Sequence, residues 1–172
     1  MTFEQANGGR VNPTFSPNNC QSCIAVFEAR MRGFNIETLP YNSKTKDIMD
    51  RLAKRPYMVY SDPQNGQPPK ILNTNANNKN EVKKWLQNNI NNNERYAFLY
   101  QPKNQSDKHM IEVMKSKEGK LIYYDPQLGT EINEKELEDI DYSKFKPRTF
   151  RVDDKELNIC VLNQISKKSN GK

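Results

Sequence analysis

The sequence has few of the residues that build metal sites and disulfide frameworks. Its 172 residues include one histidine and three cysteines. Cys20 and Cys23 form one CxxC pair, and Cys160 stands alone in an apolar run that resembles a strand. Because no second CxxC pair or histidine cluster accompanies them, we expect no bound metal. We also expect no disulfide scaffold at this low density, so a reducing compartment fits the three thiols best.

The sequence also lacks a long apolar run and a basic-then-apolar leader, so we expect a soluble chain with no membrane association. Apolar residues make up 34% of the chain and the mean hydropathy is −1.00, which still permits one small core. We predict a single domain over residues 1–172, with flexible tails at 1–10 and 166–172. Both ends look like tails, which leaves open whether the chain was cut from a longer polypeptide.

The net charge of +6 and the pI of about 9.1 could favour acidic partners or nucleic acid. The lysines are scattered rather than arranged in a stripe, however. The aromatic residues are not interleaved with basic ones, as a platform for stacked bases would require. We therefore regard a nucleic-acid-binding or RNase-type function as a minor alternative.

Periodicity predicts a helix followed by an antiparallel sheet, which is an α+β fold. The expected helices cover residues 20–32, 44–54 and 81–89, with a helical turn at 134–139. The expected strands cover 34–39, 57–60, 95–101, 108–115, 120–125, 149–152 and 157–165.

The first strongly predicted helix begins at a cysteine. A helix N-terminus carries partial positive charge, which favours a thiolate there. Cys20 lies in the first turn of this helix. Cys23 lies one turn later, where backbone N–H groups are already bonded, and is expected to be a core residue. A core role is an equal alternative for Cys20 from its position alone.

The segments 108–115 and 120–125 form a predicted hairpin joined by 116–119. A loop of three or five residues pairs odd residues with odd, which places His109 and Asp125 on one face and within side-chain reach. Asp125 could then orient the imidazole for a cysteine nucleophile. The alternative is an exposed histidine at a strand edge and an aspartate that only starts the DPQLG turn.

These motifs together resemble a known family. The stretch NNCQSCIAVFEARMRGFNIETLP, the preceding Asn12-Pro13, and His109 followed by Asp125-Pro-Gln-x-Gly are similar to papain-fold toxin domains. Those domains occur in bacterial polymorphic toxins and in phage or mobile-element proteins, and are usually labelled glutamine deamidases. The sequence departs from the pattern at Lys108 and Met110, which flank the histidine. It also has Thr14 where a papain-type oxyanion glutamine would stand.

The resemblance implies a papain-like fold, in which the helix bearing the cysteine packs on an antiparallel sheet bearing the other two residues. It implies that Cys20 is the nucleophile, His109 the general base and acid, and Asp125 the orienting carboxylate, with no cofactor. For the oxyanion, the backbone N–H of Cys20 is one candidate donor, and Asn19 or Gln127 is a candidate for the other.

The implied activity is deamidation of a glutamine side chain in a target protein. A cysteine peptidase or a transglutaminase-like enzyme with the same triad is the first alternative, and a catalytically inactive adaptor is another. We expect an acidic immunity protein to neutralise the toxin in the producing cell. We also expect delivery by secretion or by a phage or mobile element, with action in the cytoplasm of a target cell.

Overall fold

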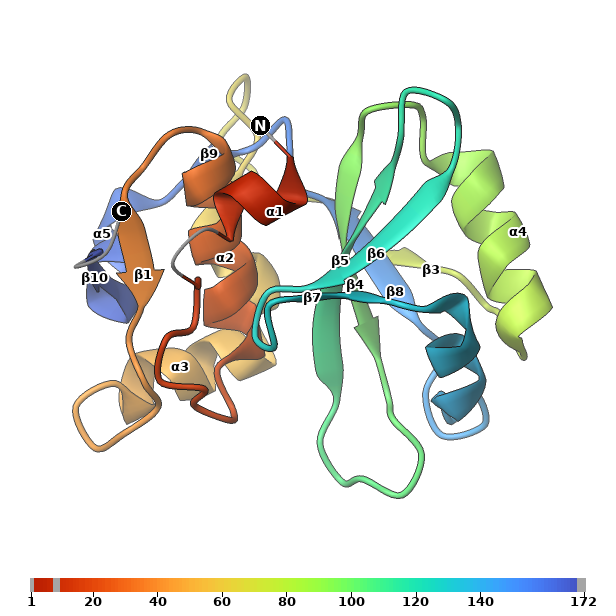
Figure 1. Ribbon diagram of the computed structural model, residues 1–172, viewed down its shortest axis with the longest axis horizontal. Coiled ribbons are helices and arrows are strands. Elements are labelled where there is room, and N and C mark those ends of the chain that lie inside the picture. Colours follow the sequence, from red (N-terminus) through yellow and green to blue (C-terminus); the bar gives the residue numbers. More distant parts are fainter. Residues whose placement is uncertain (1, 8–9, 170–172) are drawn as a thin grey trace. The chain divides into compact units, whose positions relative to one another are not determined.

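The computed structural model describes residues 2–7 and 10–169, which divide into two compact units (Figure 1). Unit 1 comprises the described residues of Met1–Pro69, Pro126–Thr130 and Asp154–Lys172. Unit 2 comprises Lys70–Asp125 and Glu131–Asp153. No helix among the described residues has the length and apolar character that a membrane span needs.

Unit 1 is built around helices and two short antiparallel strand pairs. β1 pairs with β10, and β2 pairs with β9. Its elements are α1 (Phe3–Ala6), α2 (Cys20–Met31), β1 (Ile36–Thr38), α3 (Lys46–Lys54), the 3-10 helix η1 (Pro56–Val59), β2 (Tyr60–Ser61), β9 (Glu156–Leu157), α5 (Ile159–Ile165) and β10 (Ser166–Lys168).

Helix α2 is the central element of unit 1 and confirms the helix expected over residues 20–32. Ile24, Val26 and Phe27 are fully buried, and the helix ends before Gly33, whose positive φ of 95° suits a glycine after a helix C-terminus. The helical period places the charged residues Glu28 and Arg30 away from the apolar face, yet both are buried. Nearly the whole circumference of α2 is therefore covered.

Arg30 is buried because its guanidinium group joins three segments of unit 1. Nε donates to the backbone oxygen of Ile36 at 2.7 Å, Nη1 to Ala6 at 3.0 Å and Nη2 to Arg10 at 3.0 Å. Burial lowers the pKa of Arg30, and the nearby Glu37 carboxylate partly opposes this effect. The planar, five-donor guanidinium is the side chain that can serve three carbonyls at once.

We predict that Arg30→Lys destabilises unit 1. An ammonium group cannot reach all three carbonyls, and each buried acceptor left unpaired costs about 1–3 kcal/mol. The free energy of unfolding, measured by circular dichroism in urea, should fall by about 2–4 kcal/mol. Arg32→Lys, in the more exposed arginine two residues later, is the matched control and should change little. Equal effects of the two substitutions would contradict this role of Arg30.

Unit 2 contains a six-stranded sheet in the order β3-β8-β4-β5-β6-β7. The pairs β3–β8, β8–β4, β4–β5 and β5–β6 are antiparallel. Its elements are β3 (Leu72–Asn73), α4 (Lys79–Asn89), β4 (Arg95–Tyr100), β5 (His109–Lys115), β6 (Leu121–Asp125), β7 (Thr130–Ile132), the 3-10 helix η2 (Glu134–Asp139) and β8 (Arg148–Arg151).

The core of unit 2 lies between α4 and one face of this sheet. Val82 and Leu86 of α4 are fully buried in one cluster with Phe98 of β4 and Val113 of β5. The Asn78 side chain caps the helix by accepting from the N–H of Glu81 at 2.9 Å. The helix therefore begins slightly earlier than the expected 81–89.

Two expected strands are wrong in whole or in part. Residues 57–60 form most of η1 before the short β2, and residues 157–165 form the end of β9 and then α5. The Asn158 side chain accepts from the N–H groups of Cys160 and Val161, which starts α5. Val161, Leu162 and Ile165 are buried, a spacing that fits a short helix as well as an apolar strand.

The segments expected to be flexible tails contain regular structure where they are described. Thr2 forms a capping box at α1, and the Phe3 ring packs edge-on against Phe27 at 5.2 Å. In the other segment, β10 pairs with β1. Residues 1, 8, 9 and 170–172 lie outside the described residues.

The Asp153 side chain forms hydrogen bonds to the end residues of two strands of unit 2, β4 and β8. Its carboxylate accepts from the backbone N–H of Arg95 at 2.9 Å and from Nε and Nη2 of Arg151, each at 3.0 Å. Burial by itself would raise the pKa of Asp153, but these hydrogen bonds and the nearby positive charges outweigh burial and lower it.

This lowered pKa predicts an acid-sensitive contribution to stability. The contribution is complete above the ordinary aspartate pKa of about 4, and is lost as the pH falls through the lowered value. Asp153→Asn should therefore destabilise unit 2 at neutral pH and flatten its loss of stability in acid. The measurement is urea unfolding against pH, followed by fluorescence of Trp85, the chain's single tryptophan, which packs on the unit 2 core. Asp139→Asn, a change in an exposed residue of the same unit, is the control and should leave the dependence of stability on pH as in the wild-type chain. If Asp153→Asn also shows the wild-type dependence, the prediction is refuted.

Candidate active site

Cys20 is the first residue of α2 and lies at the positive end of a twelve-residue helix. Its side chain is almost buried, with 6% of the residue exposed, and Sγ lies 3.2 Å from Oε1 of Gln21. Backbone N–H groups in the first turn have no acceptor inside the helix. The position can therefore stabilise a thiolate and can also offer N–H groups to a developing oxyanion.

The surroundings of Cys23 are those of a buried core residue. It is fully buried, its N–H donates to the backbone oxygen of Asn19 at 3.0 Å, and its Sγ lies 3.5 Å from Oδ1 of Asn19. The backbone N–H of Cys23 is therefore already hydrogen-bonded, as predicted from the sequence. Cys160 is exposed on α5. Among the three thiols, Cys20 alone begins the long helix α2.

A buried network of amide side chains holds the start of α2. Asn19 donates from Nδ2 to Oδ1 of Asn12 at 3.1 Å and to the backbone oxygen of Leu39 at 3.3 Å. Asn12 donates from its own Nδ2 to the backbone oxygens of Ser16 and Gln127, each at 3.1 Å. Asn12 and Asn19 are each at most 2% exposed. The Asn12-Pro13 match signalled this residue, although its role as the hub of the network was not predicted.

Gln127 closes the network from a distant part of the chain. Its Nε2 donates to Oδ1 of Asn19 at 3.0 Å and to the backbone oxygen of Ser16 at 3.3 Å. Two residues on, Gly129 has a φ of 73° and lies against the Asn7 side chain, which donates to its carbonyl oxygen at 3.4 Å. The left-handed backbone favours glycine there, and a Cβ would lie 2.8 Å from Nδ2 of Asn7.

These hydrogen bonds limit how Asn19 and Gln127 could donate to an oxyanion. Both side-chain amide groups, of Asn19 and of Gln127, already donate to two acceptors each inside unit 1. Either amide would have to give up one of these bonds in order to donate to a substrate. The backbone N–H of Cys20 faces no such competition from the helix itself.

The second part of the predicted triad lies in unit 2, on adjacent strands. Val113 of β5 pairs with Tyr123 of β6, and Lys115 pairs with Leu121, so odd residues oppose odd ones as expected. Nε2 of His109 lies 2.7 Å from Oδ2 of Asp125. The histidine side chain is 19% exposed and the aspartate side chain 2%. The Tyr100 ring packs edge-on against the imidazole with centroids 5.7 Å apart.

This contact determines which nitrogen of His109 can act as a base. An ionised carboxylate only accepts hydrogen bonds, so Nε2 carries the proton and donates to Asp125. Nδ1 then keeps its lone pair. The pair thus has the arrangement that an oriented general base requires, with one nitrogen held by a buried carboxylate.

We predict that Asp125 fixes the imidazole tautomer. Nitrogen-15 NMR of the single histidine should show a protonated Nε2 and an unprotonated Nδ1 at a pH where the ring is neutral. Asp125→Asn should give a mixture of the two tautomers, because an amide can donate as well as accept. Asp107→Asn, two residues before the histidine, is the control. A protonated Nδ1 in the wild-type chain would contradict the arrangement.

Cys20 belongs to unit 1 and the His109–Asp125 pair belongs to unit 2, with the chain passing from one unit to the other at Asp125-Pro126. The pairing of the thiol with the imidazole therefore stays a prediction. Within the described residues, no group of three or more His, Cys, Asp and Glu side chains is arranged to hold a metal ion.

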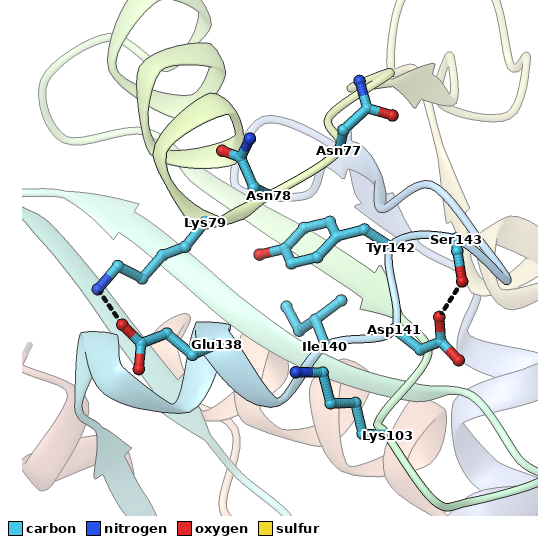
Figure 2. Close-up of a pocket in the computed structure, with 9 residues that line it drawn as sticks. All are labelled: Asn77, Asn78, Lys79, Lys103, Glu138, Ile140, Asp141, Tyr142 and Ser143. Atoms are coloured by element: carbon cyan, nitrogen blue, oxygen red, sulfur yellow. Dashed lines mark hydrogen bonds and ion pairs between the residues drawn. The ribbon is translucent and has the colours of Figure 1, made fainter.

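Figure 2 shows a cavity of about 440 Å³ in unit 2, beside the start of α4. Three of its charged side chains are hydrogen-bonded: Lys79 donates to Glu138 at 2.9 Å, and Asp141 accepts from Ser143 at 2.7 Å. The described residues that line it are Asn77, Asn78, Lys79, Lys103, Glu138, Ile140, Asp141, Tyr142 and Ser143. This lining has neither a thiol nor an imidazole, so no residue of the predicted triad lies in it.

The comparison with protein families decides the assignment. Residues 18–130, about two thirds of the chain, match the family described as papain fold toxin 1, glutamine deamidase. The chain belongs to this family. The matched region contains Cys20, His109 and Asp125, and also Asn19 and Gln127, whereas Asn12 lies just before it. A search of curated proteins found no match.

Family membership confirms the resemblance seen in the sequence. The chain is an α+β protein of the papain-fold toxin type, with a helix that begins at Cys20 and antiparallel sheets. Its general class is that of the glutamine deamidases, which are amide hydrolases. The identity of the catalytic residues and of the target stays a prediction.

Proposed function

We propose that this chain is a papain-like cysteine hydrolase that acts as a toxin by deamidating a glutamine side chain of a target protein. Cys20 is the nucleophile, His109 the general base and acid, and Asp125 the residue that orients His109. The observation that carries the proposal is the 2.7 Å contact between Nε2 of His109 and Oδ2 of Asp125. Family membership and the position of Cys20 at the start of α2 support it.

In the first step, Nδ1 of His109 takes the proton of the Cys20 thiol, and the thiolate attacks the carbon of the glutamine carboxamide. A C–S bond forms and the carbonyl oxygen becomes an oxyanion, stabilised by the backbone N–H of Cys20. The imidazolium protonates the amide nitrogen, the C–N bond breaks, and ammonia leaves. The product of this half-reaction is a thioester between Cys20 and the target protein.

In the second step, neutral His109 removes a proton from water, and the hydroxide attacks the thioester carbon. The C–S bond breaks, the Cys20 thiolate leaves, and the glutamine has become glutamate. Asp125 stabilises the imidazolium formed in each half-reaction. The two steps of the reaction consume only the amide substrate and water, so the proposal includes no cofactor.

The proposal includes two partners besides water. One is the target protein that carries the glutamine. The other is an acidic immunity protein, which the net charge of +6 favours as a neutralising partner in the producing cell. The described residues hold three free cysteines, which suits action in a reducing cytoplasm after delivery by secretion or by a phage or mobile element.

We predict that Cys20→Ala and His109→Ala each abolish deamidation while the chain stays folded. The substitutions remove the nucleophile and the only imidazole, respectively. The chain is expressed from an inducible promoter in bacterial cells, and conversion of glutamine to glutamate is mapped across the cellular proteins by mass spectrometry. The wild-type chain should convert a defined glutamine, and both variants should leave it unmodified.

Cys160→Ser and Cys23→Ser are the controls, and both should keep the activity. Conversion that persists in Cys20→Ala would disprove the scheme. Cleaved target fragments instead of a glutamine-to-glutamate change would identify a peptidase, and a new isopeptide or amine adduct would identify a transglutaminase-like enzyme.

A further inference from the structure

The two most exposed large apolar side chains of the described residues both lie in unit 1. Leu128 is 58% exposed and Phe15 is 56% exposed. Such residues cost solubility and are most informative where they cluster near a functional site. Each of these two is adjacent in sequence to a member of the amide network that holds the start of α2.

Hydrogen bonds made by the sequence neighbours of Phe15 and Leu128 connect their two loops to the start of α2. Phe15 precedes Ser16, whose backbone oxygen accepts from Asn12 and from Gln127. Leu128 follows Gln127, which also donates to Asn19 at 3.0 Å, and Asn19 directly precedes Cys20. The two loops are thus joined to each other and to the helix start by bonds that involve buried side chains.

Phe15 is also held in an unusual backbone conformation. Its φ of 53° is in the left-handed region, which bulky side chains rarely adopt, and its N–H donates to the backbone oxygen of Asn12 at 3.1 Å. The guanidinium of Arg10 lies 4.4 Å from the centre of the ring. Backbone strain of this kind persists where the surrounding structure imposes it, and it is concentrated at functional sites.

We propose that Phe15 and Leu128 form an apolar rim beside Cys20 that binds apolar side chains flanking the substrate glutamine. This inference rests on the proposed function. The substrate class is then a glutamine within a protein segment that has apolar neighbours, rather than free glutamine or a glutamine in a polar segment. A target protein presents such side chains on both sides of the carboxamide, and the two loops would contact them.

The first test uses two capped synthetic peptides, one with the glutamine between two leucines and one with it between two serines. Ammonia release by the wild-type chain should favour the leucine peptide by about tenfold in kcat/KM. Phe15→Ser and Leu128→Ser should each reduce this preference by raising KM for the leucine peptide. Neither should change kcat/KM for the serine peptide, because that peptide makes no apolar contact.

Matched controls come from the same unit. Phe34 is 46% exposed and Ile159 is 49% exposed, and neither neighbours the amide network. Phe34→Ser and Ile159→Ser should keep the wild-type preference. If Phe15→Ser and Leu128→Ser behave like these controls, the rim does not exist. If the wild-type chain shows no preference between the peptides, the inference is likewise overturned.

A second measurement separates failure of the rim from failure of the proposed function. In a Cys160→Ser background, Cys20 is alkylated with N-phenylmaleimide or with iodoacetamide, and the modified peptide is quantified by mass spectrometry. Phe15→Ser combined with Leu128→Ser should slow the phenyl reagent about tenfold relative to iodoacetamide, and Phe34→Ser should not. Absence of ammonia from both peptides would refute the deamidase. An unchanged ratio of the two alkylation rates would refute the rim.

Discussion

The start of α2 depends on one buried set of hydrogen bonds, centred on the amide of Asn19. This side chain does not cap its own helix; it bonds to Asn12, Leu39 and Gln127, which come from three separate segments. A buried amide that loses one partner costs about 1–3 kcal/mol, so each segment is constrained by the others. The position of Cys20, and of the loops on either side of it, follows from this constraint.

The two parts of the candidate site are prepared in different physical ways. The helix supplies Cys20 with partial positive charge and with unpaired N–H groups, which are properties of the backbone. His109 receives its orientation from a single buried carboxylate on the neighbouring strand. In the proposed reaction, this one histidine serves as both base and acid, and the carboxylate orients it.

The amide network includes both ends of the loop that precedes Cys20. Asn12 and Asn19 bond to each other at 3.1 Å, and Phe15 and Asn18 between them have left-handed backbones, with φ of 53° and 65°. In the same unit, Arg30 satisfies three carbonyls with one side chain, which relieves the backbone there of unpaired acceptors.

The sequence alone determined the elements whose signals are local. The period of apolar residues predicted α2, and the pairing of odd with odd residues expected for the hairpin placed His109 and Asp125 on one face. The tertiary structure decided the roles that depend on distant partners. Arg30 and Glu28 read as surface residues but are buried, residues 159–165 read as a strand but form a helix, and Asn12 becomes the hub of a network. Local periodicity records which side chains are apolar, whereas a polar side chain is buried only when a distant segment supplies its hydrogen-bond partner.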